Sequence, residues 1–254
     1  MIDAALRSRG VEPVWVVWDD PAVDWSRFAL VVVRSAWDYA ERWREFLRWA
    51  ERVQPIENPL GVLRFGVDKE LYMGALHRAG LPVVPTAFVH EGEAFSPPPE
   101  PFVVKPAISA GGRRSARFGG GDPRGEKLVG EILAGGDTAM VQPFLENVGE
   151  SALVFVDGGY SHSLRRSAAL PLGGSRDGLF LEEELGSHEA TPAERRVAES
   201  ALELLPAPTL YARVDLLGGL VLELEVVEPS LYLSFEPSAP DALAAAVATR
   251  LERP

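Results

Sequence analysis

The chain has 254 residues, enough for one large domain or two modest ones with a sizeable buried core. Hydrophobic residues make up 46% and charged residues 24%, which is typical of a globular protein and excludes disordered, collagen-like and low-complexity classes. With 37 acidic and 25 basic residues, the formal net charge is −12. We therefore expect no nucleic-acid partner and no attraction to an anionic membrane.

The chain contains no cysteine, which excludes disulfides, thiolate nucleophiles, zinc ribbons and iron–sulfur clusters. No apolar run approaches the ~18 residues of a membrane helix, and the N-terminus lacks a signal-peptide pattern. These features predict a cytoplasmic protein. Arginine is the usual cation here, because lysine occurs at only three positions, Lys69, Lys105 and Lys127.

The first part of the chain predicts alternating strands and helices. Apolar runs at 14–18 and 30–33 predict strands, and the spacing over 36–53 predicts a helix that ends before Asn58-Pro59. A second helix is expected over 67–79. The following run, 81–89, predicts an edge strand because it contains two prolines.

The remainder predicts an α+β arrangement with antiparallel sheet, and therefore a domain boundary near 60–70. The expected strands are 102–105, 139–144, 151–156, 158–163, 210–217 and 220–227, and the expected helices are 126–133, 192–205 and one after Pro240. We expect an N-terminal α/β domain over 1–65 and a second domain over 66–254.

The strongest candidate for chemistry is a hairpin with a Gly218-Gly219 turn. Period-two alternation places Glu223 and Glu225 on one face of the second strand, and Arg213 and Asp215 on one face of the first. A three-residue turn brings Asp215 opposite the glutamates, whereas a strict two-residue turn puts it on the other face. Converging carboxylates suit Mg²⁺. The alternative is an ordinary solvated sheet face.

Two further segments could bind a nucleotide. Lys105 ends a predicted strand just before a loop that contains Gly111 and Gly112, and such a loop can approach phosphate oxygens. The stretch from Gln142 to Glu150 could offer backbone amides to an adenine edge and a carboxylate to ribose hydroxyls. Taken singly, the first segment is equally well explained as a surface lysine in a turn, and the second is better explained as a connector with a polar edge.

Other nucleotide and hydrolase motifs are absent. Glu126 stands where a phosphate-binding P-loop needs lysine, and Arg124 occupies the third glycine position of a dinucleotide fingerprint. There is no G-x-S-x-G elbow, and the four histidines are too dispersed for a metal cluster.

The order of these segments resembles the ATP-grasp superfamily over roughly residues 60 to 235. The resemblance implies an ATP-grasp fold, in which a small βαβ-type domain precedes two α+β subdomains, 66–145 and 146–254, that clasp ATP. It also implies Mg²⁺ or Mn²⁺ as the metal. The residues implied to bind ATP are Lys69, Lys105, Gly111, Gly112, Gln142, Leu145 and Glu150.

The same resemblance implies catalytic roles for Arg213 and Lys105, and a metal site at Asp215, Glu223 and Glu225. Glu225 stands where most members have asparagine, and Glu228-Pro229 follows. Either Glu225 or Glu228 completes the metal site that the resemblance implies.

A narrower resemblance is to bacterial ATP-grasp proteins related to the cycloserine-pathway cyclo-ligase. It rests on Trp18-Asp19-Asp20, on Arg34-Ser35-Ala36-Trp37-Asp38-Tyr39, and on the ending from Glu223 to Leu231. Such proteins usually begin with a strand, whereas this chain opens with the helix-like Ile2 to Leu6. The candidate substrate residues are Arg34, Asp38, His162, Arg166 and Arg176. An Arg34–Asp38 pair that caps the following helix is the alternative for those two.

The resemblance implies an ATP-dependent carboxylate–amine ligase or cyclo-ligase that acts on a small amino-acid-like substrate through an acyl phosphate. ADP and phosphate are the expected co-products, and a homodimer is consistent with the resemblance. The alternatives are a non-catalytic ATP-grasp protein that binds nucleotide or a small acid, and a structural protein whose motifs are coincidental.

Overall fold

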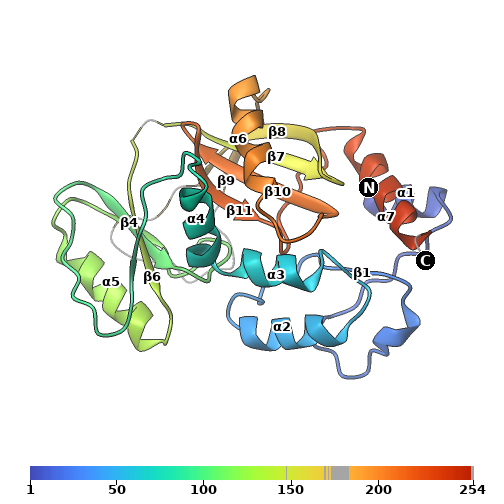
Figure 1. Ribbon diagram of the computed structural model, residues 1–254, viewed down its shortest axis with the longest axis horizontal. Helices are drawn as coiled ribbons and strands as arrows, with labels where there is room; N and C mark the ends of the chain where they lie inside the picture. The colour runs from blue at the N-terminus through green and yellow to red at the C-terminus, as the bar shows by residue number, and fades with distance from the viewer. Residues whose placement is uncertain (147, 169, 171, 173–182, 253–254) are drawn as a thin grey trace.

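The computed structural model describes residues 1–252 except 147, 169, 171 and 173–182. Three sheets organise this part of the chain (Figure 1). The N-terminal part contains a short parallel pair, β1 (Val31–Val32) and β2 (Ile56–Glu57). Helix α2 (Trp43–Arg52) lies between β1 and β2 in sequence, and α3 (Leu60–Val67) follows β2. Phe46, Trp49 and Leu63 pack in one buried cluster with Val33 and Ile56.

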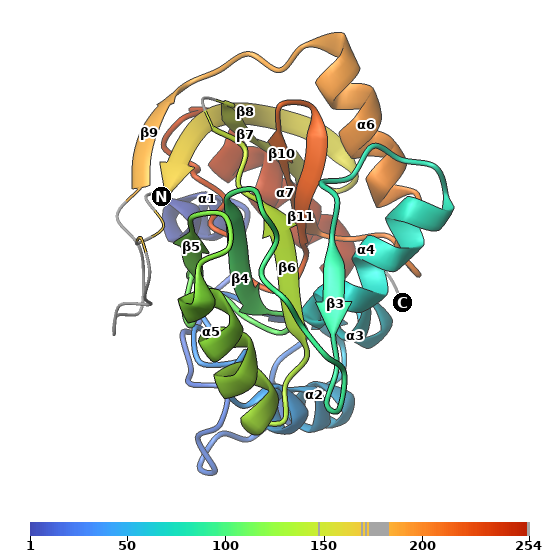
Figure 2. The same ribbon diagram turned by 90° about the vertical axis from the view of Figure 1, so that its left-hand side faces the viewer.

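The second sheet is antiparallel and holds the strand that carries Lys105. Its order is β3 (Ala87–Val89), β6 (Ala139–Pro143), β4 (Phe102–Pro106) and β5 (Ala116–Phe118). Helix α5 (Pro123–Ala134) covers one face (Figure 2), where Leu128 and Ile132 pack against Phe102 and Val104. This helix begins at Asp122, whose side chain accepts the Arg124 N–H, and Pro123 follows in the first turn.

The third sheet carries the candidate metal acids. Its order among the described residues is β11 (Leu220–Glu225), β10 (Tyr211–Leu217), β7 (Glu150–Val156), β8 (Gly159–Ala168) and β9 (Glu183–Ser187), all antiparallel. Along β10, Ala212, Val214 and Leu216 belong to the core cluster that includes α4 (Lys69–Arg78) and α6 (Pro192–Leu202). Residues 211, 213 and 215 therefore face the other side of the sheet, where Tyr211 packs in a second buried cluster and Arg213 contacts Asp215.

The two ends of the described chain lie side by side. Helices α1 (Ile2–Ser8) and α7 (Ala239–Leu251) are neighbours in Figure 1. Ile2 and Leu6 pack in one cluster with Leu243 and Val247, against Val156 of β7. None of the described helices combines the length and the apolar character needed to cross a membrane.

The structure corrects several expectations for the N-terminal part. Residues 14–17 form no strand, and Val14, Trp15 and Val17 are 59%, 62% and 63% exposed. An apolar run forms a strand only where a neighbouring strand can hydrogen-bond to it. Residues 14–17 have no such neighbour among the described strands, because β1 pairs with β2. The expected helix over 36–53 is confined to Trp43–Arg52, after a series of turns.

Further differences concern loops and helix boundaries. The helix expected over 67–79 begins at Lys69, because the Asp68 side chain accepts the Glu70 N–H and caps α4. The preceding helix α3, the 3₁₀ turn Trp25–Arg27 and strand β5 were not expected. The expected antiparallel character of the C-terminal part is confirmed.

Candidate active site

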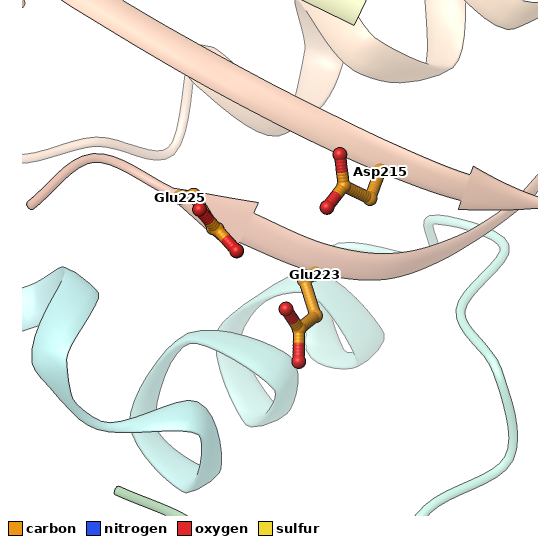
Figure 3. A group of neighbouring side chains, drawn as sticks. All are labelled: Asp215, Glu223 and Glu225. Carbon is orange, nitrogen blue, oxygen red and sulfur yellow. The ribbon is translucent and has the colours of Figure 1, made fainter. Parts of the chain in front are cut away.

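The carboxylates of Asp215, Glu223 and Glu225 meet on one face of the β10–β11 hairpin. One oxygen from each lies within 4.8 Å of the others (Figure 3). The turn is the two-residue Gly218-Gly219 type, since Leu217 pairs with Leu220. A β-bulge then shifts the register so that Asp215 pairs with Glu223. The extra residue of the bulge, Leu222, therefore brings the aspartate to the glutamate face.

Two arginines neutralise the buried Asp215. Arg213 donates from Nε to Oδ1 at 2.8 Å and from Nη2 to Oδ2 at 2.9 Å, and the same Nη2 lies 2.8 Å from a Glu225 oxygen. Arg166 of β8 approaches from the neighbouring side, with Nη1 2.6 Å from Asp215 Oδ2. Asp215 is 1% exposed. Such forked, charge-assisted contacts fix the positions of all three charged groups.

Glu223 bonds to a lysine from the other antiparallel sheet. Lys105 Nζ lies 2.9 Å from Glu223 Oε1. Burial opposes ionisation of Glu223, but Lys105 and then Lys69 outweigh it and hold the pKa of Glu223 well below its usual range. The glutamate is thus a fixed negative charge between two lysines.

Glu225 and Glu150 have the opposite tendency. Burial raises the pKa of Glu225 to about 7, against Arg213 and with the help of the Asp215 and Glu223 charges. Burial likewise raises the pKa of Glu150 to about 7, although Arg166 Nε lies 3.1 Å from Glu150 Oε1. This crowding of acids is relieved when a cation joins the group.

The glycine loop between β4 and β5 is tied to the first turn of α4. Lys69 Nζ donates to the Ser109 carbonyl at 2.6 Å and lies 3.3 Å from the Ser109 hydroxyl. Burial lowers the pKa of Lys69, while Glu223 opposes that effect. Gly111 and Gly112 have φ of 62° and 73°, a conformation that side chains rarely adopt.

A cavity of about 550 Å³ opens beside these charges. Lys105, Glu150 and Arg166 stand in its wall together with Arg165 and Glu184. The apolar part of the lining comes from Val84, Val103, Phe144, Leu145, Leu217 and Leu222. A cleft of this size with an apolar wall and a charged end suits a small ligand that has one apolar and one anionic part.

Gln142 and Leu145 reach the same cavity in different ways. Leu145 lines it in the loop after β6, whereas the Gln142 side chain is buried and donates to the Thr86 hydroxyl at 2.9 Å. Val103 and Leu222 were not among the expected residues. The period-two pattern offered a signal for Val103, because it shares a strand face with Lys105.

The N-terminal candidate Arg34 lies against the hairpin. Its Nη1 donates to the Pro229 carbonyl at 2.8 Å, and its guanidinium lies 5.2 Å from the Tyr211 ring centroid. Glu228 lies nearby, and burial followed by the charge of Glu225 raises its pKa to about 7, against Arg34. Among the described residues it is Glu225, not Glu228, that groups with Asp215 and Glu223.

Two other described candidates, Asp38 and His162, lie apart from these contacts. Asp38 accepts the Trp18 Nε1–H at 2.8 Å and an Arg42 N–H at 2.9 Å, so it organises the turns before α2. His162 is buried on β8, and its Nε2 lies 3.1 Å from the Leu231 carbonyl. Their expected substrate roles stay predictions, and Arg176 lies outside the described residues.

The chain is similar over almost its whole length to a cycloserine biosynthesis protein and to a solved D-cycloserine synthetase. Residues 1–60 match the family model of the D-cycloserine synthetase DcsG N-terminal domain. The cycloserine biosynthesis protein DcsG of Streptomyces lavendulae is 35% identical over 280 residues, which covers 98% of this chain and 92% of that protein. The crystal structure of D-cycloserine synthetase DcsG superposes with a TM-score of 0.84 at 31% identity, covering 99% and 93% of the two chains.

More distant solved structures share the fold. The ATP-grasp ligase PsnB, complexed with a minimal precursor, Mg and ADP, has a TM-score of 0.62 at 18% identity, covering 99% of this chain and 93% of PsnB. The D-alanine–D-alanine ligase of Bacillus anthracis, complexed with ATP, has a TM-score of 0.63 at 11% identity, covering 89% and 80%.

Two antiparallel sheets that bring lysines, arginines and three acids together define an ATP-grasp fold, and the expected fold class is confirmed. The two relatives at 35% and 31% identity are named as a cycloserine biosynthesis protein and a D-cycloserine synthetase, and the protein is accordingly an enzyme of the ligase class. It belongs to the D-cycloserine synthetase family.

Proposed function

We propose that this ligase uses Mg·ATP to close a ring in a small amino-acid-like substrate that carries both a carboxylate and a nitrogen nucleophile. The observation that carries the proposal is the identity of 35% over 98% of the chain to a cycloserine biosynthesis protein. The charged cleft is the place for this chemistry, since it joins fixed cations to a set of oxygen donors beside an apolar cavity.

The donor set fits a magnesium ion. Three carboxylates offer one oxygen each within 4.8 Å, and two of these residues belong to one strand whose register fixes their spacing. Burial, and then the charges of Asp215 and Glu223, raise the pKa of Glu225, and a bound cation would favour its ionised form. Asp215, Glu223 and Glu225 would hold the metal, which when bound neutralises phosphate charge. Mn²⁺ also prefers oxygen ligands and is proposed as a substitute.

The remaining nucleotide contacts are proposed from the family resemblance, and four of the residues line the cavity: Lys105, Gln142, Leu145 and Glu150. Lys69 and Lys105 would bind phosphates, and the backbone N–H groups of Gly111 and Gly112 would donate to anionic oxygens. The adenine would lie against the apolar wall near Leu145 and the end of β6 that carries Gln142. The carboxylate of Glu150 would accept ribose hydroxyls.

The reaction balances in two steps. A substrate carboxylate oxygen attacks the γ-phosphorus of ATP, the bond to the bridging oxygen breaks, and ADP leaves with that electron pair. The nitrogen nucleophile then attacks the carbonyl carbon of the acyl phosphate, loses a proton, and inorganic phosphate leaves. Arg213 and Lys105 are proposed to stabilise the charge on the transferring group, and Arg34 and Arg166 to bind the substrate carboxylate.

The test is an ADP-release assay on a panel of small amino acids with a side-chain nitrogen nucleophile. Ring closure gives a product lighter than its substrate by one water, whereas the runner-up, ligation of two molecules, gives their sum less one water. Mass spectrometry separates the two. Nucleotide binding without ADP release for any substrate in the panel would favour a non-catalytic role.

We also propose that the protein works as a cytoplasmic homodimer without a nucleic-acid partner, in keeping with its net charge of −12. Light scattering of the purified protein tests the dimer, and a gel-shift assay tests nucleic-acid binding.

A further inference from the structure

The glycine loop, residues 107–115, contacts a segment of the N-terminal part of the chain. Arg113 forms an ion pair with Glu41, which lies in the turns before α2. Ile108 and Ala110 pack against the N-terminal core cluster that contains Val33 and Tyr39. The loop therefore spans two parts of the molecule that are far apart in sequence.

The partner segment, residues 34–41, runs from the acid cluster to the loop. Arg34 holds it to the hairpin end through the Pro229 carbonyl. Successive turns then shorten it, since the Tyr39 N–H donates to the Ala36 carbonyl at 2.9 Å and the Glu41 N–H donates to the Asp38 carbonyl at 3.1 Å. A compact strap thus links the candidate substrate region to Glu41.

The loop has a defined shape between its attachment points. Lys69 holds Ser109 on one side, and the Ala107 carbonyl accepts the Lys69 N–H at 3.2 Å. Gly112 and Arg114 have φ of 73° and 51°. The Ser115 N–H donates to the Gly112 carbonyl at 3.3 Å, which closes the turn.

We propose that the Arg113–Glu41 ion pair is a latch that positions the glycine loop for the nucleotide before the nucleotide arrives. This proposal rests on the proposed function, because the loop is assigned there to the phosphates. Both are positioning residues: Glu41 acts through Arg113, and Arg113 acts through the loop backbone. A loop that is ordered in advance loses less conformational entropy on binding.

The expected effect is modest and depends on salt. The two side chains are 41% and 50% exposed, and exposed pairs of this kind contribute little each. We therefore expect Glu41→Ala to weaken binding of a non-hydrolysable Mg·ATP analogue about threefold to fivefold. Raising ionic strength to about 1 M should reduce the difference between wild type and variant, because surface charges are then screened.

The first experiment is hydrogen exchange without nucleotide. Glu41→Ala and Arg113→Ala should both speed exchange of the loop amides, including that of Ser115, with no change in α5. Unchanged exchange of the loop in Glu41→Ala would overturn the latch, whatever the enzyme does with ATP.

The second experiment is a double-mutant cycle read by the dissociation constant of the same analogue. If the pair acts as a unit, Glu41→Ala should have no further effect in an Arg113→Ala background, and the exchanged pair Glu41→Arg with Arg113→Glu should recover part of the lost affinity. Additive effects, no effect of Glu41→Ala, or no recovery in the exchanged pair would contradict the proposal.

The neighbouring arginine supplies a matched control. Arg114 pairs with Asp137 at 2.5 Å, and its side chain is 42% exposed, close to that of Arg113, but its partner belongs to the α5–β6 turn of the same sheet. Arg114→Asn suits the control, because asparagine tolerates the φ of 51°. It should leave the effect of Glu41→Ala on the dissociation constant unchanged. The variants could speed hydrogen exchange of the loop as expected while the wild type binds no nucleotide. That result would contradict both the proposed function and the role of the ion pair in nucleotide binding, although the ion pair would still order the loop.

Discussion

Lys105 on β4 and Glu223 on β11 belong to different sheets, yet their charged groups lie 2.9 Å apart. This single contact joins the strand before the glycine loop to the acid cluster. Both side chains are largely buried, so the pair is shielded from solvent screening. Under the proposed function, Lys105 would bind a nucleotide phosphate and Glu223 would bind the metal ion.

Replacing Glu223 by glutamine should remove turnover and also lower stability. The amide keeps the volume but loses the negative charge that would hold the metal, so we expect kcat to fall by about 10²-fold or more. The melting temperature should also fall, because Lys105 then keeps a largely buried charge without its partner. An ADP-release assay and a thermal melt measure the two effects. Lys127→Met, which removes an exposed lysine, is the control, and near-normal turnover of Glu223→Gln would contradict the metal assignment.

Magnesium should be needed for the nucleotide to stabilise the fold. A non-hydrolysable ATP analogue at about 100 times its dissociation constant contributes about 2.7 kcal/mol, which corresponds to a rise of roughly 5–10 °C at this chain length. The rise should appear in Mg²⁺, shrink strongly in EDTA, and be lost in Glu225→Gln. Exposed Glu203→Gln should behave like wild type. An equal rise with and without Mg²⁺ would argue against the acid cluster as the metal site.

Asn58 should be essential for stability rather than for chemistry. It is fully buried, and its Nδ2 donates to the carbonyls of Tyr211 at 3.0 Å and Val226 at 2.6 Å, while its Oδ1 accepts the Leu210 N–H at 2.8 Å. Asn58→Ala leaves these backbone groups without partners, and each such loss costs about 1–3 kcal/mol. Urea denaturation measures the loss. Gln54→Ala, on the surface near by, is the control, and a similar midpoint for both variants would contradict the assignment.

The start of α6 should make stability depend on acid pH. Burial raises the pKa of Glu194, but hydrogen bonds from Thr191, Ser151 and His188 outweigh this effect and lower it to about 2. Since the folded pKa lies below the unfolded value near 4.5, the stabilisation is complete above pH 4.5 and is lost as the pH falls toward 2. Glu194→Gln should flatten that part of the stability curve. Thr191→Ala should cost about 1 kcal/mol at neutral pH. Parallel curves for Glu194→Gln and wild type between pH 5 and 2.5 would contradict the assignment.

The C-terminal part of the fold was largely predictable because its strands alternate and pair with sequence neighbours. Apolar Val214 and Leu216 against polar Arg213 and Asp215 indicate a half-buried strand, and the structure confirms β10 there. The N-terminal part was harder. The run from Val14 to Val17 has strand-like composition, but a strand also needs a partner, and composition carries no information on that.

The candidate site was likewise predictable within one strand but not across strands. Residue type and strand parity placed Glu223 beside Glu225, but not Asp215 beside either, since the outcome depended on one bulge residue, Leu222. The contacts of Arg166 with Asp215 and of Lys69 with Ser109 join residues whose separation depends on how sheets and helices pack. No local pattern encodes such distances.

The alternation of charge in the cleft means that the protein supplies its own counterions. Four cations stand among four carboxylates: Lys69, Lys105, Arg166 and Arg213 with Glu150, Asp215, Glu223 and Glu225. An anion that binds one of these lysine or arginine side chains would displace the carboxylate paired with it. That carboxylate could then bind an incoming metal ion. Under the proposed function, binding at this site would be an ion exchange, in which anion and divalent cation raise each other's affinity by the same factor.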